Sequence, residues 1–338
     1  MTDNKLKKMD ISRRHFLGAT ALALTGIVAA PPLSFGAPAL IKNLGKPNSK
    51  IAGVQIGAIT YSFRSMESDA ESILKYCLES GISAIELMGN TAEGFAGAPQ
   101  MAMGGFQRRS DMTDAERQEM DDARAAYAKE LATWRSNTPL DKFKQLRKMY
   151  KDAGVSIYAW KPSALGRNNT DAEVDYACRV AKILGADHVT VEIPTEGSET
   201  QRLGGIASRH RVKVGYHGHL QQTYTAWDEA LSQSKYNALN FDIGHYVAAG
   251  HDPFRLLRDK HSHIVSMHMK DRQSEKNGQA NLPWGQGDTP LAEVLQLMRD
   301  QKYKFPATIE LEYQVPEGSD AVKEVSKCLD YCRQALKS

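Results

Sequence analysis

Two kinds of apolar pattern alternate from Val54 to the C-terminus. Short runs of β-branched and aromatic residues, typical of buried strands, are separated by longer segments whose apolar residues recur every three to four positions, as in amphipathic helices. Eight runs are predicted strands: VQIGAIT (54–60), AIELM (84–88), VSIYAW (155–160), HVTVEI (188–193), VKVGYH (212–217), LNFDIG (239–244), IVSMHM (264–269) and ATIELEY (307–313). The first helices between them are predicted to end at Gly81, Gly154 and Gly185, because glycine readily adopts the left-handed conformation that terminates a helix.

The alternation of strand and helix defines the fold class. Consecutive βα units produce parallel strands, and eight such units within about 260 residues predict a single-domain α/β protein with a (β/α)8 TIM barrel over residues 51–338. A doubly wound open sheet is the weaker alternative. The chain of 338 residues, 41% of them apolar and 25% charged, is long enough for one large domain of this kind.

One connection, residues 90–138, is much longer than the others. It opens with GFAGAPQMAMGGF (94–106) and continues as a charged helical pattern, TDAERQEMDDARAAYAKELATWR (113–135). An insertion after the second strand lies at the end of the barrel where substrates enter, which favours a lid. The alternative is a surface decoration or the contact of a homo-oligomer.

The first 39 residues have the character of an export signal. SRRHFLG (12–18) places two arginines before Phe16 and Leu17, and a mildly apolar run rich in Ala, Gly and Thr follows. This order resembles the twin-arginine type of signal, which predicts a periplasmic or otherwise exported protein. An apolar anchor helix is the alternative, but the run is short and weakly apolar for a membrane span, so we expect no stable span after cleavage.

Charge and cysteine content exclude several classes of protein. The formal charge is +3, and removal of the signal's five Lys/Arg and two Asp/Glu leaves 38 residues of each sign and a charge of zero. A nucleic-acid partner is therefore not expected. The four cysteines form no CxxC pair, which predicts buried thiols rather than a disulfide framework or a zinc site; they are Cys77, Cys178, Cys328 and Cys332.

Polar side chains gather where the predicted strands end. Parallel strands of a barrel direct these ends into one mouth. The residues are Glu86, Glu192, His217 with His219, Asp242 with His245, His268 with Lys270, and Glu310 with Glu312. Four consecutive strands each supply a carboxylate or an imidazole, a combination that suits an octahedral divalent ion with positions left open for substrate oxygens.

The alternation of side chains along a strand strengthens this interpretation. Phe241 and Ile243 flank Asp242 and should face the helices, which turns Asp242 inward; Met residues flank His268 in the same way. Of the two glutamates in the last strand, Glu310 lies deeper and is the better ligand. The alternative is that Asp242 and the nearby His245 only cap the turn between them.

These residues occur in motifs that resemble a known family. VGYHGH (214–219), NFDIGHYVAAGHDP (240–253), SMHMKDR (266–272), WGQGDTPLAEVLQLM (284–298) and ATIELE (307–312) have the order and spacing of the sugar phosphate isomerase/epimerase family, the xylose-isomerase-like barrels. The resemblance extends from Ile51 to the C-terminus, and 90–138 is its least typical part. It implies a TIM barrel that binds a divalent ion, which is Mn, Co, Mg or Zn.

The resemblance also implies a set of metal ligands. The family takes Glu, Asp, His and Glu from strands 5 to 8, and the last three correspond to Asp242, His268 and Glu310. Strand 5 departs from the family, since the usual xLENH reads GYHGH here and places His217 where the glutamate would stand. Either His217 binds the metal or Glu192 takes over the carboxylate role, and both remain candidates.

The expected activity is that of a sugar isomerase or epimerase. The resemblance implies a metal-stabilised enediolate, with Glu310 as the base and an imidazole, His217 or His219, as the group that returns the proton. If that imidazole instead protonates a leaving hydroxyl, the protein is a keto-sugar hydratase or dehydratase. The substrate is predicted to be a small carbohydrate, and an exported protein favours a sugar without phosphate.

Further residues are expected to contact that carbohydrate; they are His219, His245, Lys270, Glu86 and Trp284, the last by stacking on a sugar ring. Two other functions remain as alternatives. One is a non-catalytic periplasmic sugar-binding protein, which would hold no metal. The other is a metal-dependent nuclease on the same fold, which the zero charge of the processed chain disfavours.

Overall fold

The computed structural model describes residues 44–101 and 112–337 of the chain. The predicted export signal and part of the Met- and Gly-rich segment of the insertion lie outside these residues. Within the described ranges, no helix combines the length and the apolar character that crossing a membrane requires.

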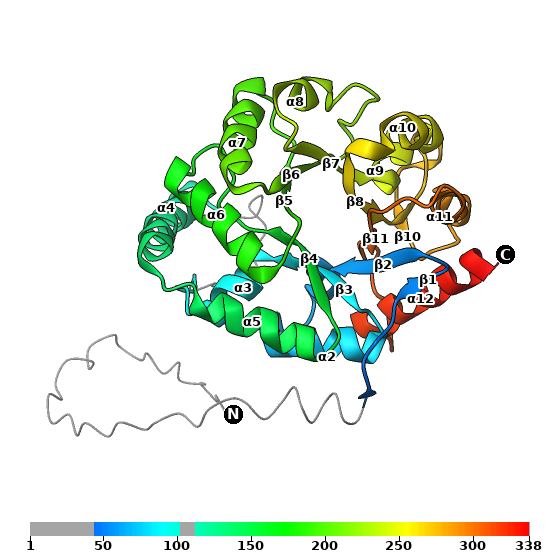
Figure 1. The fold of residues 1–338 in the computed structure, drawn as a ribbon, viewed down its shortest axis with the longest axis horizontal. Helices are drawn as coiled ribbons and strands as arrows, with labels where there is room; N and C mark the ends of the chain where they lie inside the picture. Colours follow the sequence, from blue (N-terminus) through cyan, green and yellow to red (C-terminus); the bar gives the residue numbers. More distant parts are fainter. Residues whose placement is uncertain (1–43, 102–111, 338) are drawn as a thin grey trace, which may run out of the picture. The chain divides into compact units, whose positions relative to one another are not determined.

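Eight parallel strands of the described chain form a closed barrel, and helices surround it (Figure 1). In chain order these strands are β2 (Val54–Ile59), β3 (Ala84–Met88), β4 (Ser156–Lys161), β5 (His188–Glu192), β6 (Lys213–His217), β7 (Asn237–Asp242), β8 (Ile264–Met269) and β11 (Ala307–Ile309). Each strand pairs with the next, and β11 also pairs with β2, which closes the ring. The predicted (β/α)8 TIM barrel is confirmed, and the open sheet is excluded.

Helices follow the strands in the expected alternation. They are α2 (Ala70–Ser80), α3 (Gly89–Ala96), α4 (Asp114–Asn137), α5 (Asp141–Asp152), α6 (Asp171–Leu184), α7 (Gly197–His210), α8 (Asp228–Gln233), α9 (Ile243–Ala248), α10 (Pro253–Lys260), α11 (Leu291–Asp300) and α12 (Ala321–Lys337). Gly81 and Gly185 end α2 and α6 with φ of +77° and +81°. The predicted ends of these helices are confirmed, because that conformation suits glycine best.

Short elements complete the barrel at both ends. At the N-terminal end, β1 (Lys50–Ile51) pairs antiparallel with β2. At the C-terminal end, β9 (Asp271–Arg272) and β10 (Asn281–Leu282) form a two-stranded ribbon within the long loop after β8. Single 3-10 turns cover Thr60–Phe63, His261–His263 and Glu275–Asn277. All four cysteines are buried and unpaired, as predicted.

Strand β7 shows how the barrel directs side chains. All six of its residues are buried. Phe241 points to the outer layer, where its ring meets that of Trp227 edge-on at 6.1 Å. Asp242, one residue further, lies beside His268 of β8 in register. The period of two predicted from the sequence thus places apolar residues against the helices and the carboxylate inside the barrel.

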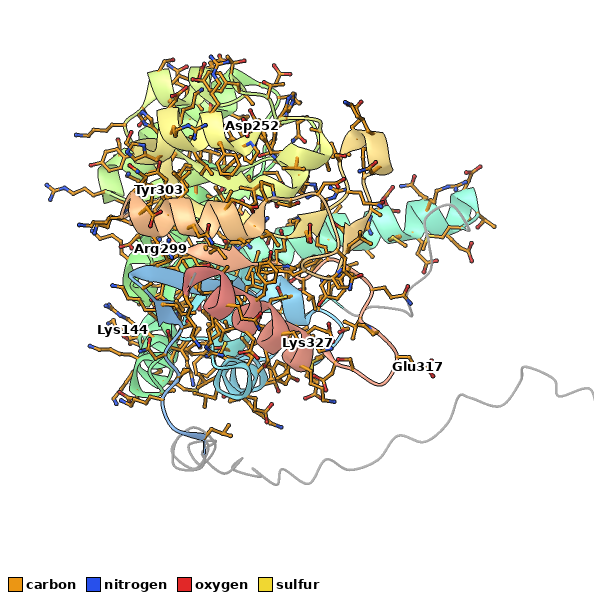
Figure 2. The ribbon with its side chains drawn as sticks, turned by 90° about the vertical axis from the view of Figure 1, so that its right-hand side faces the viewer. Lys144, Asp252, Arg299, Tyr303, Glu317 and Lys327 are labelled. Carbon is orange, nitrogen blue, oxygen red and sulfur yellow. The ribbon has the colours of Figure 1, made fainter. Side chains whose placement is uncertain are left out.

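The insertion after β3 consists of α3, α4 and the segment between them. Helix α4 begins at a capping box formed by Thr113 and Glu116, and Figure 2 shows this teal helix extending beyond the barrel. Its other end is anchored by Arg135, which donates hydrogen bonds to Glu93 (Nε to Oε1, 2.8 Å) and Glu173 (Nη1 to Oε1, 2.9 Å). A lid role for the insertion stays a prediction.

Candidate metal centre

Four side chains from consecutive strands meet at the C-terminal end of the barrel. His217 ends β6, Asp242 ends β7, His268 lies in β8, and Glu310 follows β11 directly. One possible ligand atom from each lies within 4.8 Å of the other three, and all four side chains are buried. We call these residues the four-donor site. It contains the three ligands that the resemblance implied together with His217 rather than Glu192.

The carboxylate of Asp242 has one oxygen without a hydrogen bond. Its Oδ1 accepts the backbone N–H of His245 at 2.7 Å. Its Oδ2 is buried and forms an ion pair with Lys270 Nζ at 3.0 Å, but it accepts no well-aligned hydrogen bond from any described residue. The imidazole nitrogens His217 Nε2 and His268 Nδ1 lie 3.9 and 4.0 Å from it. A buried, under-coordinated carboxylate oxygen among two imidazoles and a second carboxylate is a donor set that fits a divalent ion.

His268 is held between two carboxylates. Its Nε2 lies 2.8 Å from Glu86 Oε2, and its Nδ1 lies 3.0 Å from Glu310 Oε2. Burial alone would lower the pKa of His268, but the Glu310 and Glu86 carboxylates raise it to about 10. The ring is therefore protonated at both nitrogens in this structure. Nδ1 lies on the side of Glu310 and Asp242, so a bound metal would replace the Nδ1 proton, while Glu86 would keep the Nε2 proton, as in carboxylate–histidine–metal arrangements.

Glu86 therefore lies below the four-donor site and not at a surface open to substrate. It is fully buried, and it also accepts hydrogen bonds from Thr190 Oγ1 at 2.6 Å and Asn240 Nδ2 at 3.2 Å. Burial raises the pKa of this carboxyl, but His268 lowers it to about 2, so Glu86 is ionised. The structure gives it the position of a residue that orients His268, in place of the substrate contact expected from the sequence.

His217 is oriented by an amide. Its Nδ1 lies 3.1 Å from Asn240 Oδ1, which assigns the ring proton to Nδ1 because the Asn240 Nδ2 donates to Ser266 Oγ at 3.0 Å. Burial lowers the pKa of His217 well below its usual value. The neutral ring thus presents the lone pair of Nε2 toward Asp242, as a metal ligand requires.

Glu192 lies elsewhere, at the mouth of the barrel. Its side chain is 48% exposed, and it pairs with Lys161 (Oε1 to Nζ, 2.8 Å) and with His219 (Oε2 to Nε2, 3.6 Å). His219 is equally exposed. The structure therefore brings His217 into the four-donor site and leaves Glu192 beside a second histidine that faces solvent.

Lys270 lies among the carboxylates of the site. Its Nζ is 3.0 Å from Asp242 Oδ2, 2.6 Å from Glu310 Oε2 and 2.9 Å from Glu312 Oε2. Burial alone would lower the pKa of Lys270, but the three carboxylates raise it, so the group is an ammonium. It contacts Asp242 and Glu310, which would also hold a metal ion, and Glu312, which lies outside the four-donor site.

His245 and Arg272 complete the wall of the mouth. His245, in the first turn of α9, lies 3.1 Å (Nε2) from Lys270 Nζ, and its Nδ1 contacts Arg272 Nη1. Burial and the neighbouring Lys270 lower the pKa of His245 to about 2, so the ring is neutral. The ring centroids of His219 and His245 are 4.7 Å apart. Of these two rings, His219 is the one that faces solvent.

A layer of polar residues below the site was missed in the sequence. It includes Thr190, Asn240 and Ser266, which link Glu86, His217 and His188 through hydrogen bonds. The signal was present, since each of these residues stands two positions before a residue already selected, and residues two apart share a face of a strand. Gln222 was also missed; its Nε2 donates to the backbone oxygen of Asp242 at 3.1 Å.

Trp284 is not part of the four-donor site. It lies in the loop after β8, where its ring meets that of Tyr331 at 5.7 Å and nearly at a right angle. The same loop is held by Asp271, whose Oδ2 accepts the backbone N–H groups of Gly285, Gln286 and Gly287 at 2.7, 3.1 and 2.9 Å. The sugar contact expected of Trp284 would therefore occur outside the group of buried donors.

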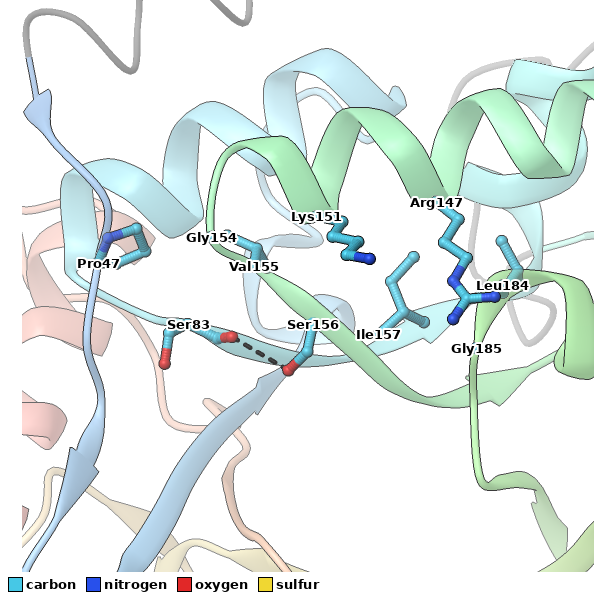
Figure 3. Close-up of a pocket in the computed structure, with 10 residues that line it drawn as sticks. All are labelled: Pro47, Ser83, Arg147, Lys151, Gly154, Val155, Ser156, Ile157, Leu184 and Gly185. Atoms are coloured by element: carbon cyan, nitrogen blue, oxygen red, sulfur yellow. Dashed lines mark hydrogen bonds between the residues drawn. The ribbon is translucent and has the colours of Figure 1, made fainter.

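A separate cavity of about 410 Å³ lies at the opposite, N-terminal end of the barrel (Figure 3). It is bounded by the start of β4 and by the helix ends at Gly154 and Gly185, and Arg147 and Lys151 reach into its opening. No carboxylate lines it. The cavity is therefore unsuited to a metal ion, and it belongs to the end of the barrel that usually serves stability.

Comparison with known protein families gives one match that covers most of the chain. The profile described as "Xylose isomerase-like TIM barrel" matches residues 74–332. Among curated proteins, the inosose dehydratase of Clostridium tetani (strain Massachusetts / E88) is 26% identical over 154 residues. That stretch is 39% of this chain and about half (51%) of the dehydratase.

Solved structures with the same fold are more distant in sequence. The probable 3-DHS dehydratase AsbF of Bacillus anthracis has a TM-score of 0.56 at 16% identity, over 82% of this chain and 97% of AsbF. A sugar phosphate isomerase/epimerase of Parabacteroides distasonis also has a TM-score of 0.56 at 16% identity, over 86% and 98%. The IOLI protein, solved with a zinc atom, has a TM-score of 0.54 at 14% identity, over 83% and 98%. These structures show the shared fold.

Proposed function

Because the chain belongs to the xylose isomerase-like TIM barrel family, we propose that it is a divalent-metal-dependent enzyme acting on a sugar or keto-sugar. The observation that carries this proposal is the four-donor site, in which two imidazoles and two carboxylates are buried with one possible ligand atom of each within 4.8 Å of the others. Stability alone does not explain such a cluster, since burying so many ionisable side chains together is costly even with Lys270 paired to Asp242 and Glu310. His217, Asp242, His268 and Glu310 would hold the ion.

The ion, when bound, would supply a Lewis acid for a carbonyl oxygen and the neighbouring hydroxyl, which makes the C–H between them more acidic. Glu310 is the base for that proton. Burial raises the pKa of its carboxyl, but Lys270 and His268 lower it well below the usual value, so the group is ionised. Its Oε2 contacts both cations, whereas no described residue donates a hydrogen bond to Oε1, which remains available to accept the proton.

Lys270 and His219 would complete the proton transfers. The buried ammonium of Lys270 adjoins Glu310 and Glu312, so it would donate to an oxygen on which negative charge develops. His219 lies at the mouth with its Nε2 3.6 Å from Glu192, where an imidazole can deliver a proton to substrate. His217 is less suited to proton transfer, because one nitrogen donates to Asn240 and the other faces Asp242.

This arrangement favours loss or addition of water over epimerisation. Epimerisation needs a base on each side of the reacting carbon, and relatives are expected to supply one of them from strand 5, where this chain has an imidazole among the metal ligands. The remaining groups are one carboxylate base and one solvent-facing imidazole, which suit removal of a proton from one carbon and protonation of a hydroxyl leaving from the next. A keto-sugar hydratase or dehydratase is therefore the favoured outcome, and an isomerase or epimerase is the second candidate.

The substrate is proposed to be a sugar without phosphate. In barrels of this class, phosphate is often bound by Gly-rich backbone N–H groups in the loops after the last two strands. Here the N–H groups of Gly285, Gln286 and Gly287 all donate to the carboxylate of Asp271. An uncharged substrate also fits a protein exported to the periplasm, the location we propose from the twin arginines at Arg13 and Arg14.

The test is to incubate the metal-loaded protein with a panel of keto-sugars in deuterated water. Exchange of the C–H next to the carbonyl together with loss or gain of water supports a hydratase or dehydratase, and exchange without a change in water supports an isomerase or epimerase. A non-catalytic sugar-binding protein would give neither result. Metal analysis distinguishes this third function further, because equal metal content in the wild-type protein and in Asp242→Ala would exclude the four-donor site.

A further inference from the structure

A second cavity, of about 340 Å³, lies beside α12 at the C-terminal half of the molecule. It is formed by the loop after β8, the loop after β11 and the outer side of α12. Figure 2 shows Glu317 at the tip of the second loop and Lys327 on α12, which flank this region. Its volume is at the lower end of the range of roughly 300–1,000 Å³ typical of small-molecule sites, so it suits a ligand of about one ring.

Aromatic side chains form much of the wall of this cavity. Trp284, Tyr313 and Tyr331 contribute to it from the three elements. The Trp284 and Tyr331 rings stand at 89° to each other with centroids 5.7 Å apart. The position of Trp284 is fixed by its loop, since the backbone N–H groups of the next residues donate to Asp271. A rigid aromatic wall provides flat apolar surface at little entropic cost.

The polar groups of the cavity fall into two kinds. Glu324 is saturated, because its carboxylate accepts hydrogen bonds from Tyr313 Oη at 2.7 Å, Ser319 Oγ at 2.5 Å and Lys327 Nζ at 2.7 Å. In contrast, Trp284 Nε1 is a buried donor without a partner among the described residues, and no described group hydrogen-bonds the side-chain amides of Gln286 and Gln334, which also line the cavity.

The available groups are therefore uncharged donors and acceptors next to aromatic faces. Hydroxyl groups on a ring whose C–H bonds form an apolar face match both features, whereas an anion would find its cation, Lys327, already paired with Glu324. We propose that this cavity binds a neutral saccharide ring, at a site separate from the four-donor site. The amides of Gln286 and Gln334 hydrogen-bond its hydroxyls, and the aromatic wall contacts the C–H face.

Residues of this cavity lie close in sequence to residues of the metal centre. Tyr313 stands three residues after Glu310, and Asp271, which holds the Trp284 loop, follows Lys270 directly. Occupancy of the cavity nevertheless requires none of the four donors. Saccharide binding here is therefore independent of the proposed function, and each can fail without the other.

The test is saturation-transfer NMR of the full chain with glucose and with cellobiose, followed by titration to a dissociation constant. Trp284→Ala is expected to weaken binding about tenfold, the loss of roughly one aromatic contact. Gln286→Ala and Gln334→Ala should each weaken it by a smaller factor. Trp284→Phe keeps an aromatic face and should bind more tightly than Trp284→Ala, which shows that the loss does not come from misfolding.

Two controls separate this site from the metal centre. Asp242→Asn should bind the sugar as the wild-type protein does, and glucose 6-phosphate should bind no more tightly than glucose. The proposal is overturned if neither sugar binds the wild-type protein, if Trp284→Ala binds as tightly as wild type, or if Asp242→Asn abolishes binding, which would assign the sugar to the four-donor site.

Discussion

The four-donor site at the C-terminal end of the barrel gathers buried ionisable side chains, whereas the ionisable side chains that line the cavity at the N-terminal end reach solvent. The four-donor site adjoins Glu86 and Lys270, and all six side chains are buried. The cavity at the other end is lined by Arg147 and Lys151, both of them exposed. Burying charge costs several kcal/mol per ion unless partners compensate it. The C-terminal end, where this desolvation is unfavourable for folding, is also the end whose side chains are expected to take part in catalysis.

The largest effect is expected from removing a donor. Asp242→Ala should reduce deuterium exchange into a substrate by more than about 100-fold, the upper range for residues that only orient a ligand, and should lower the bound metal measured by elemental analysis. Arg147→Ala at the opposite end is the matched control and should change neither quantity. Equal losses in both variants would remove the functional distinction between the two ends.

The next effect concerns the buried ion pairs that anchor the insertion. Arg135→Ala leaves Glu93 and Glu173 buried without their partner and should lower the free energy of unfolding by about 3–5 kcal/mol. Arg124→Ala, which removes an exposed arginine of the same helix, should change it by less than about 1 kcal/mol. Denaturant titration measures both. A small effect for Arg135→Ala would show that unpaired buried carboxylates outside the four-donor site lower the free energy of unfolding only slightly.

A pH-dependent effect is expected from His188, at the start of β5. Burial lowers the pKa of His188 to about 4, and its Nε2 contacts Ser266 Oγ at 2.9 Å. As the pH falls, His188 is protonated in the unfolded chain before it is protonated in the folded one. The contribution of the neutral ring to the free energy of unfolding is therefore fully present above pH 6.5 and is lost as the pH falls toward 4, by at most about 3 kcal/mol. Denaturant titrations from pH 7 to 4 should show a smaller decrease for His188→Gln, and an unchanged slope would contradict the assignment.

The smallest effect tests the residue below the site. Glu86→Gln should weaken metal affinity by about 10- to 100-fold, because a neutral amide holds His268 less firmly than a carboxylate does. Glu192→Gln, a change of the same kind at the mouth, should leave metal affinity unchanged, since Glu192 pairs with Lys161 and His219 instead. Competition with a metal-sensitive dye measures both. If Glu192→Gln lost more metal affinity than Glu86→Gln, Glu192 rather than His217 would be the fourth metal ligand.

The sequence predicted the eight strands, and its candidate ligands included all four donors with Glu192 as the alternative to His217, because strands and inward-facing residues both follow from a period of two and from short βα spacing. It did not predict depth. Glu86 is the third of the five residues of β3 and lies beneath His268, whereas Glu192 is the last residue of β5 and faces solvent. The prediction placed both at the mouth and overlooked that Glu86 stands inside its strand; the stagger of strands around the barrel then determines how deep that position lies.

Loop conformation was equally beyond the sequence. Lys270 was expected to contact substrate, which stays a prediction, but the sequence did not show that its Nζ lies within 3.0 Å of two carboxylates of the four-donor site. Trp284 was expected at the mouth and lines a separate cavity. Both positions depend on how the loop after β8 is folded around Asp271, which is a matter of backbone hydrogen bonds that no residue pattern specifies.

The carboxylate of Asp271 is a covalently attached anion that occupies the backbone N–H groups of the loop after β8. A tethered group competes at an effective concentration in the millimolar range or above and cannot diffuse away. Any free anion would have to displace it from three N–H donors at once. Under the proposed function, this tethered carboxylate is the group that would exclude a substrate phosphate from the loop. Exchanging this single side chain for an uncharged one would free the loop for a different class of substrate.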